Sequence, residues 1–204
     1  MKIAIIAEGR TEKAFKPHLL NFLRTQLSGK IPKLDFHIYD WCIPTNDKLK
    51  RVVERLLRGK DAADHVIALT DVYTGANPPI FVNAVDAKAK MREWVGEDQR
   101  FHPHAAQHDF EAWLLPYWST IQKLAKHNKT APNGNPETIN HNDPPAYRIA
   151  EIFENGKCRD SYIKPRDANR ILSENDLSVA IRQCPELKSF INTILEICGG
   201  TLLP

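Results

Sequence analysis

The sequence predicts an α/β fold in which a mostly parallel sheet is covered by helices. Three observations carry this prediction. Short, almost wholly apolar runs at residues 2–7 and 65–70 suit strands that are buried on both faces. Segments with the apolar spacing of amphipathic helices lie between the strands. Up to residue 125 strands and helices alternate, which is the order typical of parallel sheets.

The first two strand–helix pairs occupy the first 60 residues. The opening strand ends at Glu8-Gly9, and Thr11 precedes a helical stretch with an apolar stripe. Residues 33–42 alternate in strand fashion, and Asp47 can cap the next helix, whose apolar residues recur at helical spacing. The outer face of that helix is rich in Lys and Arg.

The next two pairs follow the same order. The strand at 65–70 is followed by a Pro-rich loop at 74–79 and by a helical composition over 81–95. A short strand is expected at 101–107, and the apolar positions from 110 to 125 predict one strong helix from residue 109.

The composition changes after residue 127, and this change predicts how the chain is divided. Residues 1–127 form the α/β core, and residues 128–145 are rich in Asn, Pro and Thr without apolar periodicity. We expect this segment to be a flexible loop, either a functional loop or a disordered connector. Residues 146–204 are helical in period and form a C-terminal portion packed on the core.

Composition excludes several classes of protein. The 204 residues contain no apolar run of the ~18 residues that a membrane-spanning helix needs. The N-terminal apolar run is too short for a signal peptide, so a cytoplasmic location is expected. The 4 cysteines show no CxxC spacing, and the chain contains neither GxxxxGK[ST] nor GxGxxG. Any ATP hydrolysis would therefore belong to a partner protein.

The net charge of +3 conceals an uneven distribution. Residues 1–60 hold 13 Lys or Arg against 6 Asp or Glu, whereas residues 61–204 hold 15 against 19. A basic first third suggests a polyanionic partner such as nucleic acid, although basic helices are often only solvated.

Acidic residues follow the predicted strands. Glu8 follows the first strand, Asp71 the third, and Asp109 and Glu111 the fourth. Ligands of open parallel sheets bind beyond the carboxyl ends of the strands, and Mg²⁺ prefers carboxylate oxygens there. The alternative interpretation is that these acids, with Glu12, cap helices. Because several acids follow strands, we favour a site, and Gly9 permits a tight turn beside it.

Three histidines, His102, His104 and His108, have a spacing in which the first two share one strand face. A zinc or manganese site is conceivable, but the intervening Pro103 weighs against it, and core or surface histidines are the default interpretation. The four tryptophans, Trp41 among them, are expected in the core, with stacking on bases as a minor alternative.

At these residues the sequence resembles a known family. The stretch EGRTE at 8–12 is similar to the opening Toprim motif, FEAWLL at 110–115 to the FExWLL helix start of Toprim-like proteins, and YIK at 162–164 to a YxK element. The resemblance is to the family called domain of unknown function 4276 and its relatives, which are partnered with ATPases in bacterial anti-phage and abortive-infection systems. It implies a Toprim-like Rossmannoid sandwich, Mg²⁺- or Mn²⁺-dependent phosphodiester chemistry and, commonly, nuclease activity.

The resemblance also implies roles for individual residues. Glu8, Asp71, Glu111 and Lys164 correspond to the family's functional positions, so the first three would hold the metal and Lys164 would stabilise developing negative charge. Glu12 and Asp109 could complete the metal shell. The remaining candidates are basic residues expected to contact a nucleic-acid backbone, Arg166 also being an alternative to Lys164: Arg10, Lys13, Lys48, Arg51, Arg55 and Arg166.

One departure from the pattern keeps a second interpretation open. Toprim enzymes usually carry another aspartate two positions after the first, where this chain has Tyr73. The leading hypothesis is a metal-dependent nuclease acting on DNA or RNA, the effector of an anti-phage system with an ATPase partner. The alternative is a catalytically weak nucleic-acid-binding or sensor subunit of such a complex. A receiver-like domain with Asp71 as phosphoacceptor is a third hypothesis, which the long helical tail disfavours.

Overall fold

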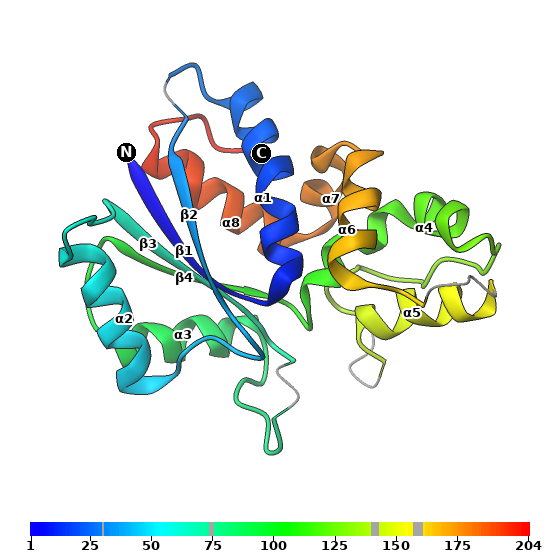
Figure 1. Ribbon diagram of the computed structural model, residues 1–204, viewed down its shortest axis with the longest axis horizontal. Helices are drawn as coiled ribbons and strands as arrows, with labels where there is room; N and C mark the ends of the chain where they lie inside the picture. Colours follow the sequence, from blue (N-terminus) through cyan, green and yellow to red (C-terminus); the bar gives the residue numbers. More distant parts are fainter. Residues whose placement is uncertain (30, 74–75, 140–142, 157–160) are drawn as a thin grey trace.

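A computed structural model describes residues 1–29, 31–73, 76–139, 143–156 and 161–204. Four strands form one parallel sheet in the order β2-β1-β3-β4 (Figure 1). The strands are β1 (Lys2–Glu8), β2 (Lys33–Tyr39), β3 (His65–Asp71) and β4 (Phe101–Ala106). The predicted α/β class with a parallel sheet is confirmed, and the second strand ends at residue 39 rather than 42.

Helices cover both faces of this sheet because its strands are apolar on both sides. On β1, Ala4 and Ile6 face a cluster with α2 (Asn46–Arg58) and α3 (Ala84–Val95), whereas Ile3 and Ile5 face a second cluster. The second cluster includes α1 (Gly9–Gln26) and α8 (Pro185–Ile197). Alternate side chains of a strand point to opposite faces, so one apolar run supplies both layers.

The remaining helices lie beyond one end of the sheet, on the right of Figure 1. They are α4 (Trp118–Ala125), α5 (Pro145–Asn155), α6 (Lys164–Ser173) and α7 (Leu177–Gln183). Their buried side chains continue the cluster that holds α1 and α8. Within the described residues, no helix is long and apolar enough to cross a membrane.

The segment at 128–145 contains no helix or strand in its described part before α5 begins, and residues 140–142 lie outside the described residues. Trp118 Nε1 donates a 2.7 Å hydrogen bond to the carbonyl of Lys129, and Glu137 and Ile139 are buried. Several of its residues therefore contact the helical part of the molecule. Its flexibility and the domain boundaries at 127 and 146 stay predictions.

One predicted helix is wrong in its first half. Residues Phe110–Tyr117 form a 3₁₀ helix, η1, and the α-helix begins only at Trp118. Pro116 lies inside η1 and has no N–H to donate to the carbonyl of Ala112, which removes one α-helical hydrogen bond at this point. All of residues 110–115 are buried, because neighbouring helices pack around them. An amphipathic pattern would leave one face exposed.

Candidate functional site

The predicted acidic residues meet in one pocket at the carboxyl edge of the sheet. Glu8 ends β1, Asp71 ends β3, and Glu111 lies in η1, the element that follows β4. The pocket has a volume of about 320 Å³. Its charged lining consists of Glu8, Arg10, Glu12, Asp71, Glu111 and Lys164. The topology brings Glu8 and Asp71 together because all four strands run in the same direction.

Gly9 makes the turn between β1 and α1 possible. Its φ is +79°, a conformation that L side chains rarely adopt. A Cβ added at this position would lie 3.1 Å from Glu12 Oε2. Gly9 therefore makes the tight turn that the sequence predicts, and the Glu12 carboxylate lies against it at the start of α1.

Two groups of the neighbouring strand orient the carboxylate of Glu8. Thr70 Oγ1 donates a hydrogen bond to Glu8 Oε1, and the backbone N–H of Asp71 donates to the same oxygen at 2.6 Å. Burial raises the pKa of Glu8 to about 7, although both hydrogen bonds act to lower it. Thr70 is a residue that the sequence did not single out, because a β-branched residue in a buried strand is indistinguishable from a core residue.

The neighbouring carboxyl groups repel one another. Burial raises the pKa of Asp71 well above its ordinary range, and the charges of Glu8 and Glu12 raise it further. Burial, followed by the charges of Glu111 and Glu8, likewise raises the pKa of Glu12. A positive charge added to this pocket would therefore stabilise the ionised forms of these carboxyl groups.

Asp109 lies beside this pocket without lining it. Its Oδ2 accepts a 3.1 Å hydrogen bond from the backbone N–H of Ala146, which ties the start of η1 to α5. Its Oδ1 is buried and has no hydrogen-bond partner among the residues that the structure describes. Burial, with Glu111 second, raises the pKa of Asp109 to about 7.

The YIK element reaches the site from the other end of the chain. Tyr162 OH donates to Glu111 Oε1 at 3.3 Å, and Lys164 Nζ lies 3.4 Å from Glu111 Oε2. Partial burial acts to lower the pKa of Lys164, but the carboxylates of Glu111, Asp109 and Asp71 outweigh it and raise that pKa. Tyr162 is therefore a contact of the site, although no role for it is predicted from the sequence.

The donor set fits a divalent cation in chemistry and charge. Carboxylate oxygens are the ligands that Mg²⁺ and Mn²⁺ prefer, and Asp109 offers a buried oxygen without a partner in the described residues. No three His, Cys, Asp or Glu side chains in the described ranges are already arranged around a metal position. The side chains would have to close around the ion, and metal binding stays a prediction.

The basic residues divide into two groups. Arg10 lines the acidic pocket, and Lys13 is exposed nearby on α1. Lys48, Arg51 and Arg55 are exposed on α2.

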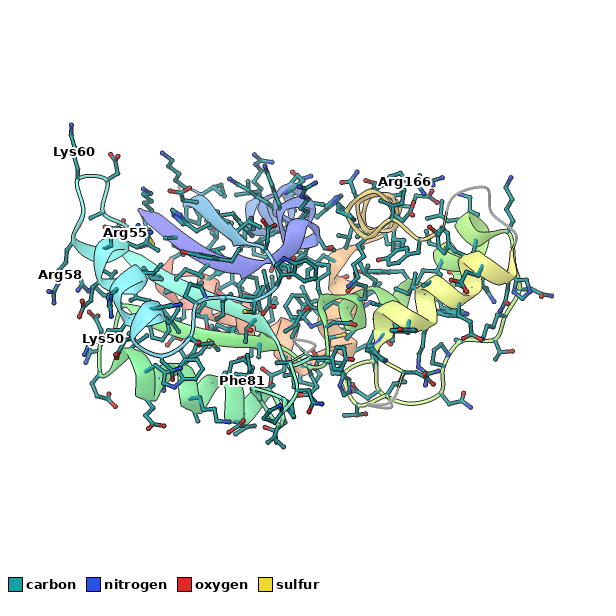
Figure 2. All side chains as sticks on the ribbon, turned by 60° about the horizontal axis from the view of Figure 1, so that its bottom comes forward. Lys50, Arg55, Arg58, Lys60, Phe81 and Arg166 are labelled. Atoms are coloured by element: carbon teal, nitrogen blue, oxygen red, sulfur yellow. The ribbon has the colours of Figure 1, made fainter. Side chains whose placement is uncertain are left out.

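Arg55 lines a different hollow, with Lys2 and Lys33 at the amino ends of β1 and β2, a strand length of about 20 Å from the carboxylates. Figure 2 shows Lys50, Arg55, Arg58 and Lys60 at one end of the molecule, with Arg166 toward the other.

Arg166 does not line the acidic pocket. Its Nε and Nη2 each lie 3.0 Å from a carboxylate oxygen of Asp167, which is fully buried and also accepts from Arg170 at 3.3 Å. The guanidinium thus contacts a neighbouring residue of α6, and Lys164 is the charged residue of α6 that lines the acidic pocket.

The predicted core position is wrong for Trp41 and confirmed for the other three tryptophans. Trp113 and Trp118 are buried, and Trp94 packs against Phe81. Trp41 is 92% exposed and lines the acidic pocket. Tyr73, in the position of the second Toprim aspartate, is 55% exposed, and its backbone N–H donates to the carbonyl of His108.

The histidines have separate protein partners. His102 shares a 3.1 Å hydrogen bond with His65, and His104 shares one of 3.0 Å with Thr193. His108 is buried with a φ of +73°. Within the described ranges no metal-binding group surrounds them, so nothing supports a transition-metal site.

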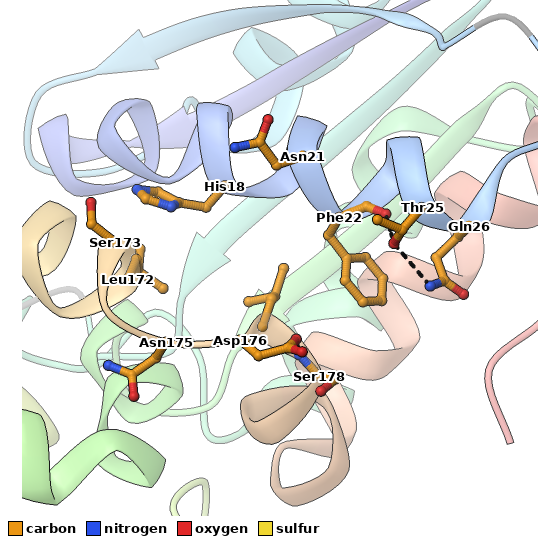
Figure 3. A pocket seen from close by; sticks show the side chains of 11 residues that line it. His18, Asn21, Phe22, Thr25, Gln26, Leu172, Ser173, Asn175, Asp176 and Ser178 are labelled. Atoms are coloured by element: carbon orange, nitrogen blue, oxygen red, sulfur yellow. Dashed lines mark hydrogen bonds between the residues drawn. The ribbon is translucent and has the colours of Figure 1, made fainter.

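A larger hollow lacks comparable chemistry. It has a volume of about 530 Å³ and lies between α1 and the α6–α7 connection (Figure 3). His18, Asn21, Asn175 and Asp176 are among its polar residues, and Asp176 is already used as the N-cap of α7, where it accepts from Ser178 N. The acidic pocket, in which several charged groups converge, is therefore the candidate functional site.

Comparison with known proteins agrees with this fold. The structure of the C-terminal region of the Burkholderia pseudomallei OLD protein is similar, with a TM-score of 0.52 and 13% sequence identity over 96% of this chain and 98% of that chain. Identity this low shows a common fold alone. None of the curated proteins compared with this sequence matches it.

A family model agrees with the sequence motifs. It matches residues 7–195, which include the acids of the pocket and the YIK element. The α/β sandwich predicted from the sequence is the fold of this chain, and the OLD C-terminal region shares it. The chain therefore belongs to the family described as Domain of unknown function (DUF4276).

Proposed function

We propose that this chain is a metal-dependent nuclease of the Toprim type, which hydrolyses phosphodiester bonds of DNA or RNA. One observation carries the proposal: Glu8, Glu12, Asp71, Glu111 and Lys164 line a single pocket at the carboxyl edge of a parallel sheet. Raised pKa values of Glu8, Glu12 and Asp71 support it, because crowded carboxylates favour a bound cation. The fold shared with the OLD C-terminal region is consistent with it.

The contacts of each side chain suggest its role in the reaction. Glu8 is fixed by Thr70 and by the backbone of Asp71, so it would present its carboxylate in one orientation. Glu111 is positioned by Tyr162, and Glu8, Asp71 and Glu111 would hold the ion with Glu12 or Asp109. Bound Mg²⁺ or Mn²⁺ would supply an activated water and charge neutralisation at the phosphate. Lys164 would stabilise negative charge that develops on the phosphate oxygens.

Partners are part of the proposal. We expect an ATPase partner and a place in a bacterial anti-phage or abortive-infection system, as the family resemblance implies. Co-purification of an ATPase with the tagged chain from its native host would support this; a chain that purifies alone and acts alone would contradict it.

A second candidate function is favoured by a specific observation. Tyr73 stands where a second acid would be expected, and no three ligands in the described residues are preassembled. A phenol does not replace an ionised carboxylate as a ligand at neutral pH. The second candidate is therefore a nucleic-acid-binding or sensor subunit that cuts weakly.

The deciding experiment incubates purified protein with labelled DNA and RNA in the presence of Mg²⁺, Mn²⁺ or a chelator. We expect cleavage that requires metal and is lost in Glu8→Gln, while Glu93→Gln, a change on the exposed surface of α3, retains it. Cleavage in chelator, or equal cleavage by Glu8→Gln, would refute the nuclease proposal. Binding without cleavage under every metal would favour the second candidate.

A further inference from the structure

Trp41 is held in an unfavourable position on the surface. Its side chain is 92% exposed, although indole is among the side chains that gain most from burial. Its φ is +78°, and the N–H of Cys42 donates to the carbonyl of Asp40 at 3.1 Å. A three-residue turn with this φ resembles the classic γ-turn, which is rare and strained. The chain thus accepts both an exposed indole and a strained backbone at this position.

This position lies beside the acidic pocket. Tyr39, the last residue of β2, pairs in register with Glu8, the last residue of β1. Trp41 follows two residues later and lines the same pocket as Glu8 and Lys164.

A second exposed aromatic lies on the other side of β1. Tyr73 follows the end of β3 by two residues and is 55% exposed. Since β1 lies between β2 and β3, aromatic residues follow the strands on both sides of Glu8.

We propose that Trp41 stacks on an unpaired nucleobase next to the phosphate held in the pocket, so that the preferred substrate is single-stranded nucleic acid or a single-stranded segment. This inference rests on the proposed function. The faces of a base are open to an indole only when the base is unstacked from its neighbours, which a duplex does not offer without disruption. Tyr73 does not line the pocket, so the proposal rests on Trp41.

The surroundings of Trp41 favour nucleic acid over a protein partner. A protein-binding tryptophan normally stands in an apolar patch with a polar rim. The pocket beside Trp41 instead contains carboxylates, Lys164 and Arg10. A flat aromatic group next to cations and a cation-attracting pocket matches the alternation of base and phosphate along a single strand.

The test measures binding separately from cleavage. Wild-type protein in Mg²⁺ is titrated into a short labelled single strand and into its duplex, both with phosphate linkages that resist hydrolysis, so that Glu8 stays intact. We expect tighter binding of the single strand, and a loss of about tenfold for that strand alone on Trp41→Ala. Trp41→Phe should retain most of the affinity because a phenyl ring still stacks. Tyr147→Ala, which removes an exposed aromatic that does not line the pocket, is the matched control and should change neither affinity.

Tryptophan fluorescence gives an independent readout. Trp113 and Trp118 are buried and Trp94 packs against Phe81, so most quenching by a bound single strand should come from Trp41 and disappear in Trp41→Ala. Unchanged single-strand affinity in Trp41→Ala, or an equal loss for strand and duplex, would overturn the proposal. So would a Trp41→Ala variant that binds nucleic acid normally and loses only a co-purifying protein.

The two proposals can fail separately. Metal-dependent cleavage that is indifferent to Trp41 would refute stacking and leave the nuclease. Single-strand binding that depends on Trp41, in a wild-type protein that never cleaves, would refute the nuclease and support stacking at this pocket.

Discussion

Lys164 Nζ lies 3.4 Å from Oε2 of Glu111, so a half-exposed ammonium group faces a buried carboxylate. The two residues are 53 positions apart in sequence, and this contact joins the start of α6 to η1. Glu111 holds Tyr162 with its other oxygen. A buried acid thus positions two side chains of the C-terminal part of the chain at the carboxyl edge of the sheet.

Lys164→Met should lower the cleavage rate strongly and the free energy of unfolding only slightly. Because the ammonium is half exposed, its loss should lower the free energy of unfolding by only about 1 kcal/mol. Loss of a group that stabilises phosphate charge should lower the cleavage rate by about a hundredfold. Cleavage assays and urea denaturation of the same preparations measure the two effects.

Lys164→Arg is the matched variant, because it keeps the charge while changing the shape. It should recover a substantial part of the activity. A Lys164→Met protein that cleaves at the wild-type rate would remove Lys164 from the mechanism.

Glu8→Gln should stabilise the protein in the absence of metal while abolishing cleavage. Glutamine can accept the hydrogen bonds from Thr70 and the N–H of Asp71, but it carries no charge. The pKa of Glu8 is raised to about 7 from 4.5, so the folded state binds more protons than the unfolded state between these values. Wild-type stability is therefore lost relative to the variant as pH rises from about 4.5 to about 7.

Thermal unfolding of both proteins across this pH range measures the effect. The advantage of Glu8→Gln should be small at the acidic end and complete above about pH 7. Added Mg²⁺ should raise the unfolding temperature of the wild type more than that of the variant, because an ion that binds only the folded state stabilises it. An advantage that shrinks as pH rises would contradict the crowding of carboxylates.

The parallel sheet explains why much of the site could be predicted. The apolar runs ending at Glu8 and Asp71 identify strands buried on both faces, and parallel strands place their ends at one edge. That rule needs no knowledge of loops or side-chain contacts. Lys164 could be predicted only through the family resemblance, because its contact with Glu111 depends on how α6 packs.

The errors have local physical causes. The apolar positions of residues 110–125 satisfy a helical period, yet residues 110–117 form η1, where Pro116 lacks one α-helical hydrogen bond and residues 110–115 are all buried. Apolar character alone assigned Trp41 to the core, whereas a turn with positive φ exposes it. The charge count predicts that Arg10 and Arg55 belong to one nucleic-acid-binding surface. Because α2 runs back along the sheet, Arg55 instead lies toward the opposite edge.

His104 should make the protein sensitive to acid. Burial, and then the charge of Lys88, lowers its pKa from 6.5 to about 3. The unfolded state therefore binds the proton first, and stability is lost as pH falls from about 6.5 toward 3. At about pH 4.5 this costs roughly 2 to 3 kcal/mol relative to neutral pH.

Urea denaturation of wild type and His104→Gln at neutral and acidic pH tests this expectation. Glutamine can keep a hydrogen bond with Thr193 without titrating, so the variant should lose less stability on acidification. Equal acid sensitivity of the two proteins would show that other groups, such as His102, cause the loss of stability at low pH.

Glu137→Ala should destabilise the protein by about 3 kcal/mol, because Glu137 satisfies several donors in the interior. Its carboxylate accepts from Trp113 Nε1 at 2.9 Å and from the backbone N–H groups of Glu186 and Leu187 at the start of α8. Glu137→Gln keeps an acceptor oxygen and removes a charge that burial disfavours, since burial raises the pKa of Glu137, so its cost should be much smaller than that of Glu137→Ala. Urea denaturation measures both variants, and equal costs would show that charge, not hydrogen bonding, carries the effect. Because Glu137 does not line the acidic pocket, metal-dependent cleavage per folded molecule should be unchanged in Glu137→Gln.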